Sequence, residues 1–282
     1  MLHIVMDSAG DVPPEWLEQF QIHIIPVNIH FGEETYLDGV TLDKDGFYRM
    51  VEERGIIPKT SQPSPHQFVS FYRQIANPGD TVLSIHVTSR LSGTYASAEI
   101  AARDLEGEID VVPFDSGCGS AGMGFMCMEA RLLERAGATI ENILARLREI
   151  RERMQIILTL DTLDFARMSG RVKTLQAALV SLLNIKPVIE LQNGMLEMAD
   201  KVRTRSRALK HVIARIQECF GDVPLNVAVV HAADITSGKK LLAQVRNHLH
   251  CKRLILTDLS IAVAANLGPG TVGIVAYPAG KV

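Results

Sequence analysis

The sequence has few of the residues from which disulfide scaffolds and metal sites are built. Only four of its 282 residues are cysteine, one is tryptophan, and aromatic residues make up 5% of the chain. No two cysteines form a CxxC pair, so we expect all four to be reduced and mostly buried. The segment His248-Leu249-His250-Cys251 is the only cluster of metal-binding residue types, but it closes a helical pattern, where histidine suits the negative end of the helix dipole. We expect no metal and no cofactor.

Charge and hydropathy give no sign of a nucleic-acid-binding or membrane-spanning protein. The formal net charge is −3, and 22% of the residues are charged, so no excess of one sign favours nucleic acid or an anionic membrane. No apolar run reaches the roughly 18 residues that a transmembrane helix needs. Residues 1–7 have the pattern of a buried strand and lack the basic start and long apolar stretch of a signal peptide. We expect a cytoplasmic protein that binds no nucleic acid and does not insert stably into membranes.

Motifs of three common classes of protein are also missing from the positions where those classes carry them. Neither a G-x-G-x-x-G pattern after the first strand nor a Walker A loop occurs, which argues against a nucleotide-binding domain. The chain has no G-x-S-x-G elbow, in which an α/β-hydrolase would hold its nucleophile. A serine-dependent acyl hydrolase or acyltransferase is the alternative to a binding protein, with Ser92 as nucleophile and His86 on the preceding strand as its base. We expect His86 to be buried instead, which weighs against this alternative.

Strand and helix patterns alternate through the first half of the chain. Short runs rich in Ile and Val are separated by amphipathic helical patterns, as in a parallel sheet covered by helices on both faces. The predicted strands are residues 3–6, 23–31, 81–87 and 109–114, and the predicted helices begin near residues 13, 42, 64, 92 and 119. We interpret residues 1–154 as an α/β domain with a parallel, doubly wound sheet.

The pattern changes after about residue 154. Asn193-Gly194 separates two strand-like runs, residues 185–191 and 195–202, and supplies the positive φ angles of a tight hairpin turn. Residues 175–183 are apolar on nearly all sides, as in a buried helix. Further strands are predicted over residues 155–160, 225–231, 253–257 and 272–277, and further helices over residues 207–220 and 237–250. We interpret residues 155–282 as a second α/β domain, whose mixed sheet contains the hairpin.

Two segments crowded with hydroxyl groups precede helical patterns in the first domain. They are residues 60–65 (TSQPSP) and residues 89–98 (SRLSGTYASA). The second follows a predicted strand, as do Asp7-Ser8 and Asp115-Ser116, and ligands of open parallel sheets bind beyond the carboxyl ends of the strands. Hydroxyl groups and the unpaired N–H groups of a helix start together suit a small anion. Each segment alone is also explained by helix caps and turns, so their convergence at one edge is what predicts a binding site.

These segments, together with others further along the chain, resemble a known family. The others are the Asp115-Ser116 turn with the glycine-rich helix start after it, Ser169-Gly170-Arg171-Val172, Lys186-Pro187 and Gly268-Pro269-Gly270. In this order and at this spacing the sequence resembles the DegV family over essentially its whole length. The resemblance implies a two-domain bacterial cytosolic protein that binds one long-chain fatty acid and is not itself an enzyme. It further implies the role of B subunit of fatty-acid kinase, whose catalytic subunit phosphorylates the bound carboxylate to the acyl phosphate that feeds phospholipid synthesis.

The resemblance also assigns roles to single residues. Thr60 and Ser92 match the hydroxyl groups that bind the carboxylate in the family, with Ser61 and the backbone of Gly93 as neighbours. Asn266 stands two residues before the Gly-Pro-Gly segment, where family members commonly carry a histidine whose ring can reach the carboxylate. Asparagine still donates a hydrogen bond but has no titratable charge.

Two groups of basic residues are candidates for docking the kinase subunit. In the family, arginines of the corresponding Ser-Gly-Arg and hairpin segments are linked to kinase docking or phosphate approach, which points to Arg171 and Arg203. Arg203, Arg205 and Arg207 alternate along the chain, so their side chains would lie on one side if the hairpin strand continued. The simpler interpretation is a solvated surface whose ion pairs contribute little.

Overall fold

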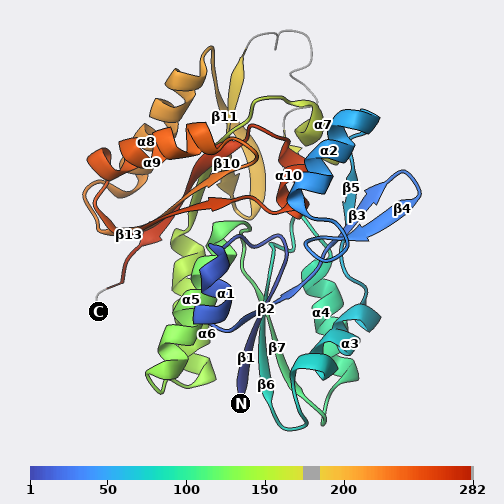
Figure 1. Cartoon of the computed structure of the whole chain (residues 1–282). Helices are drawn as coiled ribbons and strands as arrows, with labels where there is room; N and C mark the ends of the chain where they lie inside the picture. Colours follow the sequence, from blue (N-terminus) through green and yellow to red (C-terminus); the bar gives the residue numbers. More distant parts are fainter. Residues whose placement is uncertain (174–184, 281–282) are drawn as a thin grey trace. The chain divides into compact units, whose positions relative to one another are not determined.

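A computed structural model describes residues 1–173 and 185–280 of the chain. The described residues form two compact units (Figure 1). The first unit comprises Met1–Glu152 together with Ser260–Ala262, and the second comprises Arg153–Leu259 and Val263–Val282. The helix predicted over residues 175–183 lies outside the described residues.

The core of the first unit is a four-stranded parallel sheet in the order β2-β1-β6-β7. Its strands are β1 (Leu2–Asp7), β2 (Ile22–Ile25), β6 (Thr81–His86) and β7 (Asp110–Asp115). Ile4, Val5 and Met6 of β1 are fully buried. A strand covered on both faces has no solvent side, which is why this segment is continuously apolar rather than alternating.

Helices cover both faces of this sheet (Figure 1). On one face α5 packs on β1 and β6, and on the other α4 packs on β6 and β7 beside α3. The helices of this unit are α1 (Pro14–Gln19), α2 (Lys44–Arg54), α3 (Pro65–Ile75), α4 (Thr94–Asp104), α5 (Ala121–Arg135) and α6 (Ile140–Arg153). At the start of α3, Ser64 and Gln67 form a reciprocal capping box, and Pro65 takes the first position, where no N–H is needed. The parallel, doubly wound arrangement predicted from the sequence is confirmed.

The chain changes sheets at Pro26. The sequence predicts one strand over residues 23–31, and this is wrong: β2 ends at Ile25, and β3 (Asn28–Phe31) joins a separate antiparallel sheet in the order β4-β3-β5. The outer strands of that sheet are β4 (Glu34–Leu37) and β5 (Lys59–Ser61). Proline has no N–H to donate to a strand ladder, so the parallel pairing ends before it and the chain is free to leave the sheet.

A buried chain of hydrogen bonds runs from α3 to the end of β1. The Tyr72 hydroxyl donates to Ser84 Oγ over 2.8 Å, and Ser84 Oγ lies 2.8 Å from His86 Nε2. On its other side the ring places Nδ1 3.1 Å from Oδ2 of Asp7. All four side chains are fully buried, and burial raises the pKa of the Tyr72 hydroxyl, which therefore stays a neutral donor.

The second unit contains a seven-stranded mixed sheet in the order β13-β12-β14-β8-β10-β11-β9. Strands β12 and β13 are parallel and are joined by α9, whereas β14 runs antiparallel to β12 and to β8. Helices α8 and α9 pack on the sheet over a cluster that includes the fully buried Val227, Leu241 and Ile274. The strands are β8 (Gln155–Thr159), β9 (Val172–Lys173), β10 (Lys186–Gln192), β11 (Met195–Val202), β12 (Leu225–His231), β13 (Cys251–Asp258) and β14 (Val272–Pro278). The helices are α7 (Asp164–Ser169), α8 (Arg205–Phe220), α9 (Ile235–His248) and α10 (Ile261–Leu267).

The predicted hairpin is formed by β10 and β11. Gln192 pairs with Met195 across the turn. Asn193 and Gly194 have φ angles of 50° and 76°, the left-handed values that a two-residue type I′ turn requires. The mixed sheet and its hairpin confirm the fold class expected for the second half of the chain.

The part of the chain that the structure describes contains no helix both long and apolar enough to cross a bilayer. The same residues hold no group of three or more His, Cys, Asp or Glu side chains placed to bind a metal ion. All four cysteines are free. The expectation that most of them are buried is met by Cys118 and Cys127, but Cys251 is half-buried and Cys219 is exposed.

We expect Ser84→Ala to lower the free energy of unfolding by about 1–3 kcal/mol, because it leaves the buried Tyr72 hydroxyl and His86 Nε2 without their shared partner. Chemical denaturation of the purified protein measures the change. Thr81→Ala is the control, since Thr81 lies on the same strand but bonds the exposed Asp110; it should alter stability by less than about 0.5 kcal/mol. Equal stability of the two variants would contradict the prediction.

Candidate functional site

The carboxyl ends of β1 and β6 mark the point where the parallel sheet reverses its winding. From β1 the chain passes to β2 on one side, whereas β6 and β7 lie on the other. Ligands of such sheets bind outside the strand ends at this point. Here the buried carboxylate of Asp7 accepts hydrogen bonds from the backbone N–H of Ala9 (3.0 Å) and of Val87 (2.9 Å). The loops that follow β1 and β6 are thereby tied together.

Ser92 lies where the loop after β6 turns into α4. The N–H groups of Leu91 and Ser92 both donate to the carbonyl oxygen of Thr88, which forms the turn. Ser92 Oγ lies 2.8 Å from the hydroxyl of Thr94 and accepts the Thr94 N–H at 3.3 Å. The N-cap residue of α4 is Gly93, which makes no side-chain cap hydrogen bond. A partly buried hydroxyl therefore stands at the positive end of a helix whose cap residue offers no side-chain acceptor.

The two hydroxyl-rich segments meet at Gly93. A Cβ atom added there would lie 2.9 Å from Nε2 and 3.2 Å from Cδ of Gln62. The side chain of Gln62 thus lies directly against the start of α4, and the absence of a side chain at Gly93 makes this approach possible. Convergence of the two segments was expected from their hydroxyl groups, whereas Gln62, the residue that joins them, carries no signal of this role in the sequence pattern.

Thr60 and Ser61 present their hydroxyl groups on opposite faces of the small sheet. Thr60 pairs with Ile29 and Ser61 with Asn28, and successive side chains of a strand alternate between faces. Ile29 is fully buried, so Thr60 shares the covered face. On the other face, Ser61 Oγ lies 2.8 Å from Nε2 of His30 and accepts a 3.4 Å hydrogen bond from Asn28. The two hydroxyl groups therefore do not converge on one point. Had residues 59–61 been recognised as a strand, the alternation of its side chains would have predicted this separation.

Asp115, at the end of β7, organises the neighbouring loops. Its Oδ1 accepts the N–H of Gly117 at 2.9 Å and that of Ser89 at 3.3 Å, while its carbonyl oxygen accepts Nη1 of Arg151 at 3.1 Å. Ser116 is fully buried. The Asp115-Ser116 turn therefore supports the loop that leads to Ser92, and its carboxylate is occupied by backbone donors.

Asn266 belongs to the second unit, where it lies near the end of α10 and is partly buried. Gly268 and Gly270 follow with φ angles of 86° and 75°. Cβ atoms at these positions would lie 2.9 Å from the ring of Phe165 and 2.6 Å from Cβ of Asp161. The Gly-Pro-Gly segment is thus a closely packed turn, and glycine is required there for both conformation and space.

The three alternating arginines do not continue the hairpin strand, so the condition under which they would share one side is not met. Strand β11 ends at Val202, and Thr204 caps α8 by accepting the N–H of Arg207, so the strand does not continue. The guanidinium of Arg205 donates to Asp234 at 3.0 Å and also to the carbonyl oxygen of Gly270, so it holds the second unit together. Arg203 and Arg207 are exposed.

Arg171, the other predicted docking residue, follows the left-handed Gly170 that ends α7. It is partly buried. Its N–H donates to Ser169 Oγ at 3.3 Å, and its guanidinium donates to the carbonyl oxygen of the same residue. The side chain is therefore folded back onto its own turn.

The arrangement gives no support to a serine enzyme. Ser84, His86 and Asp7 are connected in the order of a catalytic triad, but all three are fully buried, and a nucleophile must reach its substrate. As expected, His86 is buried and its ring nitrogens face Ser84 and Asp7, so it is not the base of Ser92. The hydroxyl partner of Ser92 is Thr94.

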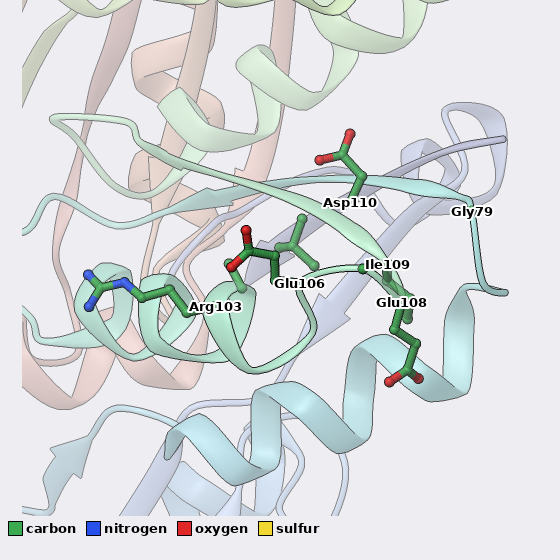
Figure 2. A pocket seen from close by; sticks show the side chains of 9 residues that line it. Gly79, Arg103, Glu106, Glu108, Ile109 and Asp110 are labelled. Carbon is green, nitrogen blue, oxygen red and sulfur yellow. The ribbon is translucent and has the colours of Figure 1, made fainter.

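An open pocket of about 510 Å³ lies at the other end of the parallel sheet, beside the amino ends of β6 and β7 (Figure 2). It is lined by Gly79, Ala102, Arg103, Glu106, Gly107, Glu108, Ile109, Asp110 and Val111. The lining carries the carboxylates of Glu106, Glu108 and Asp110 together with the guanidinium of Arg103 (Figure 2), and Glu108 is paired with Arg73. The pocket lies at the amino ends of these strands, so it does not belong to the site at the switch point.

The chain is similar to known proteins over nearly its whole length. The family model described as "Uncharacterised protein, DegV family" matches residues 1–279. Protein DegV of Bacillus subtilis (strain 168) is 32% identical over 273 residues, which cover 96% of this chain and 97% of that protein. A DegV lipid binding protein from Thermotoga maritima has a similar crystal structure, with a TM-score of 0.89 at 28% identity over 100% of this chain and 99% of that one. A structure described as fatty acid binding of a DegV family protein from Thermus thermophilus gives a TM-score of 0.88 at 30% identity, covering 99% of each chain.

Proposed function

The chain belongs to the DegV family, as its sequence resemblance predicts, and on this premise we propose that it binds one long-chain fatty acid. The carboxylate lies at the start of α4 and the tail is buried. The observation that carries the proposal is the meeting of the two hydroxyl-rich segments at Gly93, beside the switch point of the parallel sheet. The similar structures described as lipid binding and fatty acid binding support the same ligand class. The protein acts as a binding protein in the bacterial cytoplasm, without chemistry of its own.

The head group of a fatty acid needs hydrogen-bond donors rather than catalytic bases. Thr60 and Ser92 supply hydroxyl groups, and Gly93 lets the backbone at the positive end of α4 come close to the carboxylate. Asn266 is the third side-chain donor of the proposal. Hydrogen bonds to an ionised group are about twice as strong as neutral ones, so a few donors suffice to orient the ligand.

The tail supplies most of the affinity. Burial is worth about 0.8 kcal/mol per CH₂ group, so a sixteen-carbon chain gains on the order of 10 kcal/mol before the cost of ordering it. The hydroxyl groups add only a small part of this binding free energy. Their role is to orient the ligand, with its carboxylate at the start of α4, whereas burial of the tail determines the affinity.

Fatty acid should co-purify with the protein at up to one molecule per chain. The purified protein is denatured, extracted with solvent and analysed by mass spectrometry, and a delipidated sample is titrated with labelled palmitate or oleate. We expect a free fatty acid in the extract and saturable uptake at one site. An extract without lipid, combined with no saturable uptake of either label, would overturn the proposed function.

We expect Thr60→Ala and Ser92→Ala each to weaken fatty-acid binding by roughly 1–3 kcal/mol, because each removes a hydrogen bond to a charged group. Isothermal titration with oleate measures the loss. Ser61→Ala is the matched control: its hydroxyl faces the other side of the sheet and is engaged by His30, so affinity should change by less than about 0.5 kcal/mol. Should Ser61→Ala weaken binding while Thr60→Ala does not, the assignment of the two hydroxyl groups is reversed.

The bound carboxylate is presented to the catalytic subunit of a fatty-acid kinase, which forms the acyl phosphate used in phospholipid synthesis. Arg203 and Arg171 are the residues through which the subunits dock. Arg203 suits this role because it is exposed between β11 and α8, and a guanidinium pairs with both carboxylates and phosphates through two parallel hydrogen bonds. Arg205 is excluded from docking by its contacts with Asp234 and Gly270.

Arg203→Ala should reduce acyl-phosphate formation at least several-fold while leaving fatty-acid affinity unchanged, because the side chain binds the partner and not the ligand. Two assays on the same variant measure this: oleate titration, and turnover with a cognate kinase subunit. Arg246→Ala, which removes another exposed arginine of the second unit, is the control and should affect neither. Unchanged turnover would show that Arg203 has no role in docking, and lost fatty-acid binding would place it in the ligand site.

A further inference from the structure

Three residues that are distant in sequence are built into the first unit. The chain leaves the second unit after Leu259, contributes Ser260–Ala262 to the first, and returns to the second at Val263, within α10. Two buried carboxylates, Asp11 and Asp38, accept hydrogen bonds from backbone N–H groups of this excursion. Neither carboxylate belongs to the hydroxyl-rich segments.

Asp11 lies in the loop after β1 and is 3% exposed. Its Oδ1 accepts the N–H of Ser260 at 2.7 Å, and its Oδ2 accepts the hydroxyl of Ser120. Ser120 has φ 53° and ψ −144°, a conformation that residues with a side chain rarely adopt and that persists only where the surroundings enforce it. The loop that carries Asp11 also packs closely on α5, since a Cβ on Gly124 would lie 2.5 Å from the carbonyl oxygen of Asp11.

Asp38 follows β4 and is 7% exposed. Its Oδ2 accepts both the hydroxyl of Ser8, at 2.8 Å, and the N–H of Ala262, at 3.0 Å. Ser8 Oγ in turn accepts the N–H of Val27 at 3.0 Å, and the N–H of Asp38 donates to the carbonyl oxygen of Val27 at 3.0 Å. The carboxylate that receives the beginning of α10 is thus fixed by the loops that follow β1 and β2.

Burial has a marked effect on both carboxyl groups. Loss of water raises the pKa of Asp11 to about 6 and that of Asp38 to about 6. The hydrogen bonds to each group act in the opposite direction, as does the positive charge of Lys44 at the start of α2, but they do not offset the desolvation. Lys44 is the charged side chain that acts on both groups.

We propose that Asp11 and Asp38 clasp Ser260–Ala262 to the first unit and fix the start of α10.

The direction of the pH dependence follows from proton binding. Each carboxyl group has a pKa of about 6 in the clasped state, and water that reaches it when the segment is released lowers the pKa toward its ordinary value of 3.8. Between these values the clasped state binds more protons, so its advantage is complete below about pH 4 and is lost as the pH rises through 6. At pH 5 each group favours the clasped state by up to about tenfold more than at pH 7.5.

Hydrogen exchange of a peptide covering residues 258–268 tests the clasp directly. Protection of the parent protein, corrected for intrinsic exchange, should be about tenfold or more higher at pH 5 than at pH 7.5. Asp11→Asn and Asp38→Asn keep an acceptor oxygen but cannot take up a proton, and combining them should make protection nearly independent of pH. Asp43→Asn, which alters the exposed carboxylate that caps α2 through Gly46, is the control and should keep the parent's pH dependence.

Two results would overturn the clasp: no pH difference in the parent, or an undiminished difference in the double Asn variant. Asp11→Ala, which removes the acceptor, should loosen the segment at pH 7.5, while Asp11→Asn retains the protection of the parent.

Discussion

The carboxylate of Asp7 holds together the part of the molecule on which the candidate site depends. Strands β1 and β6 end side by side, and the backbone N–H groups just beyond their ends must find partners because they are buried or partly buried. Asp7 supplies those partners for Ala9 and Val87, and its remaining contact with His86 continues into the buried chain that ends at Tyr72. With both loops fixed, the start of α4 lies beside the switch point of the sheet, where a ligand of an α/β domain is expected.

Hydroxyl groups occur throughout this region, and burial and strand alternation decide what each one does. Ser84 is fully buried and serves only the internal chain. Ser61 faces His30, while Thr60, one residue earlier, faces the covered side of the same strand. Ser92 stands at the start of a helix with a glycine cap. The same chemical group therefore supports the fold, links two strands or stands at the start of a helix, according to its place.

The arginines after the hairpin show the same dependence on local geometry. Thr204 caps α8 and so ends the extended conformation that would have placed Arg203, Arg205 and Arg207 side by side. Arg205 is directed into the second unit, where Asp234 and the carbonyl oxygen of Gly270 hold it. An arginine in the sequence is therefore weak evidence for partner binding. Arg205 has a structural role at the start of α8, whereas Arg203 and Arg207, two residues to either side, are exposed.

The sequence by itself determined the features that short-range patterns encode. Continuous apolar runs indicated the parallel strands, Asn193-Gly194 indicated the hairpin, Ser64 indicated the start of α3, and six spaced motifs indicated the family. The break at Pro26 was also a local signal, although the run of apolar residues on either side concealed it. Only the tertiary structure decided that Gln62 packs on Gly93 and that Asp11 receives the N–H of a residue 249 positions away. Local patterns specify which residues are buried, but the partner of a buried polar group depends on which strands and loops the fold brings together.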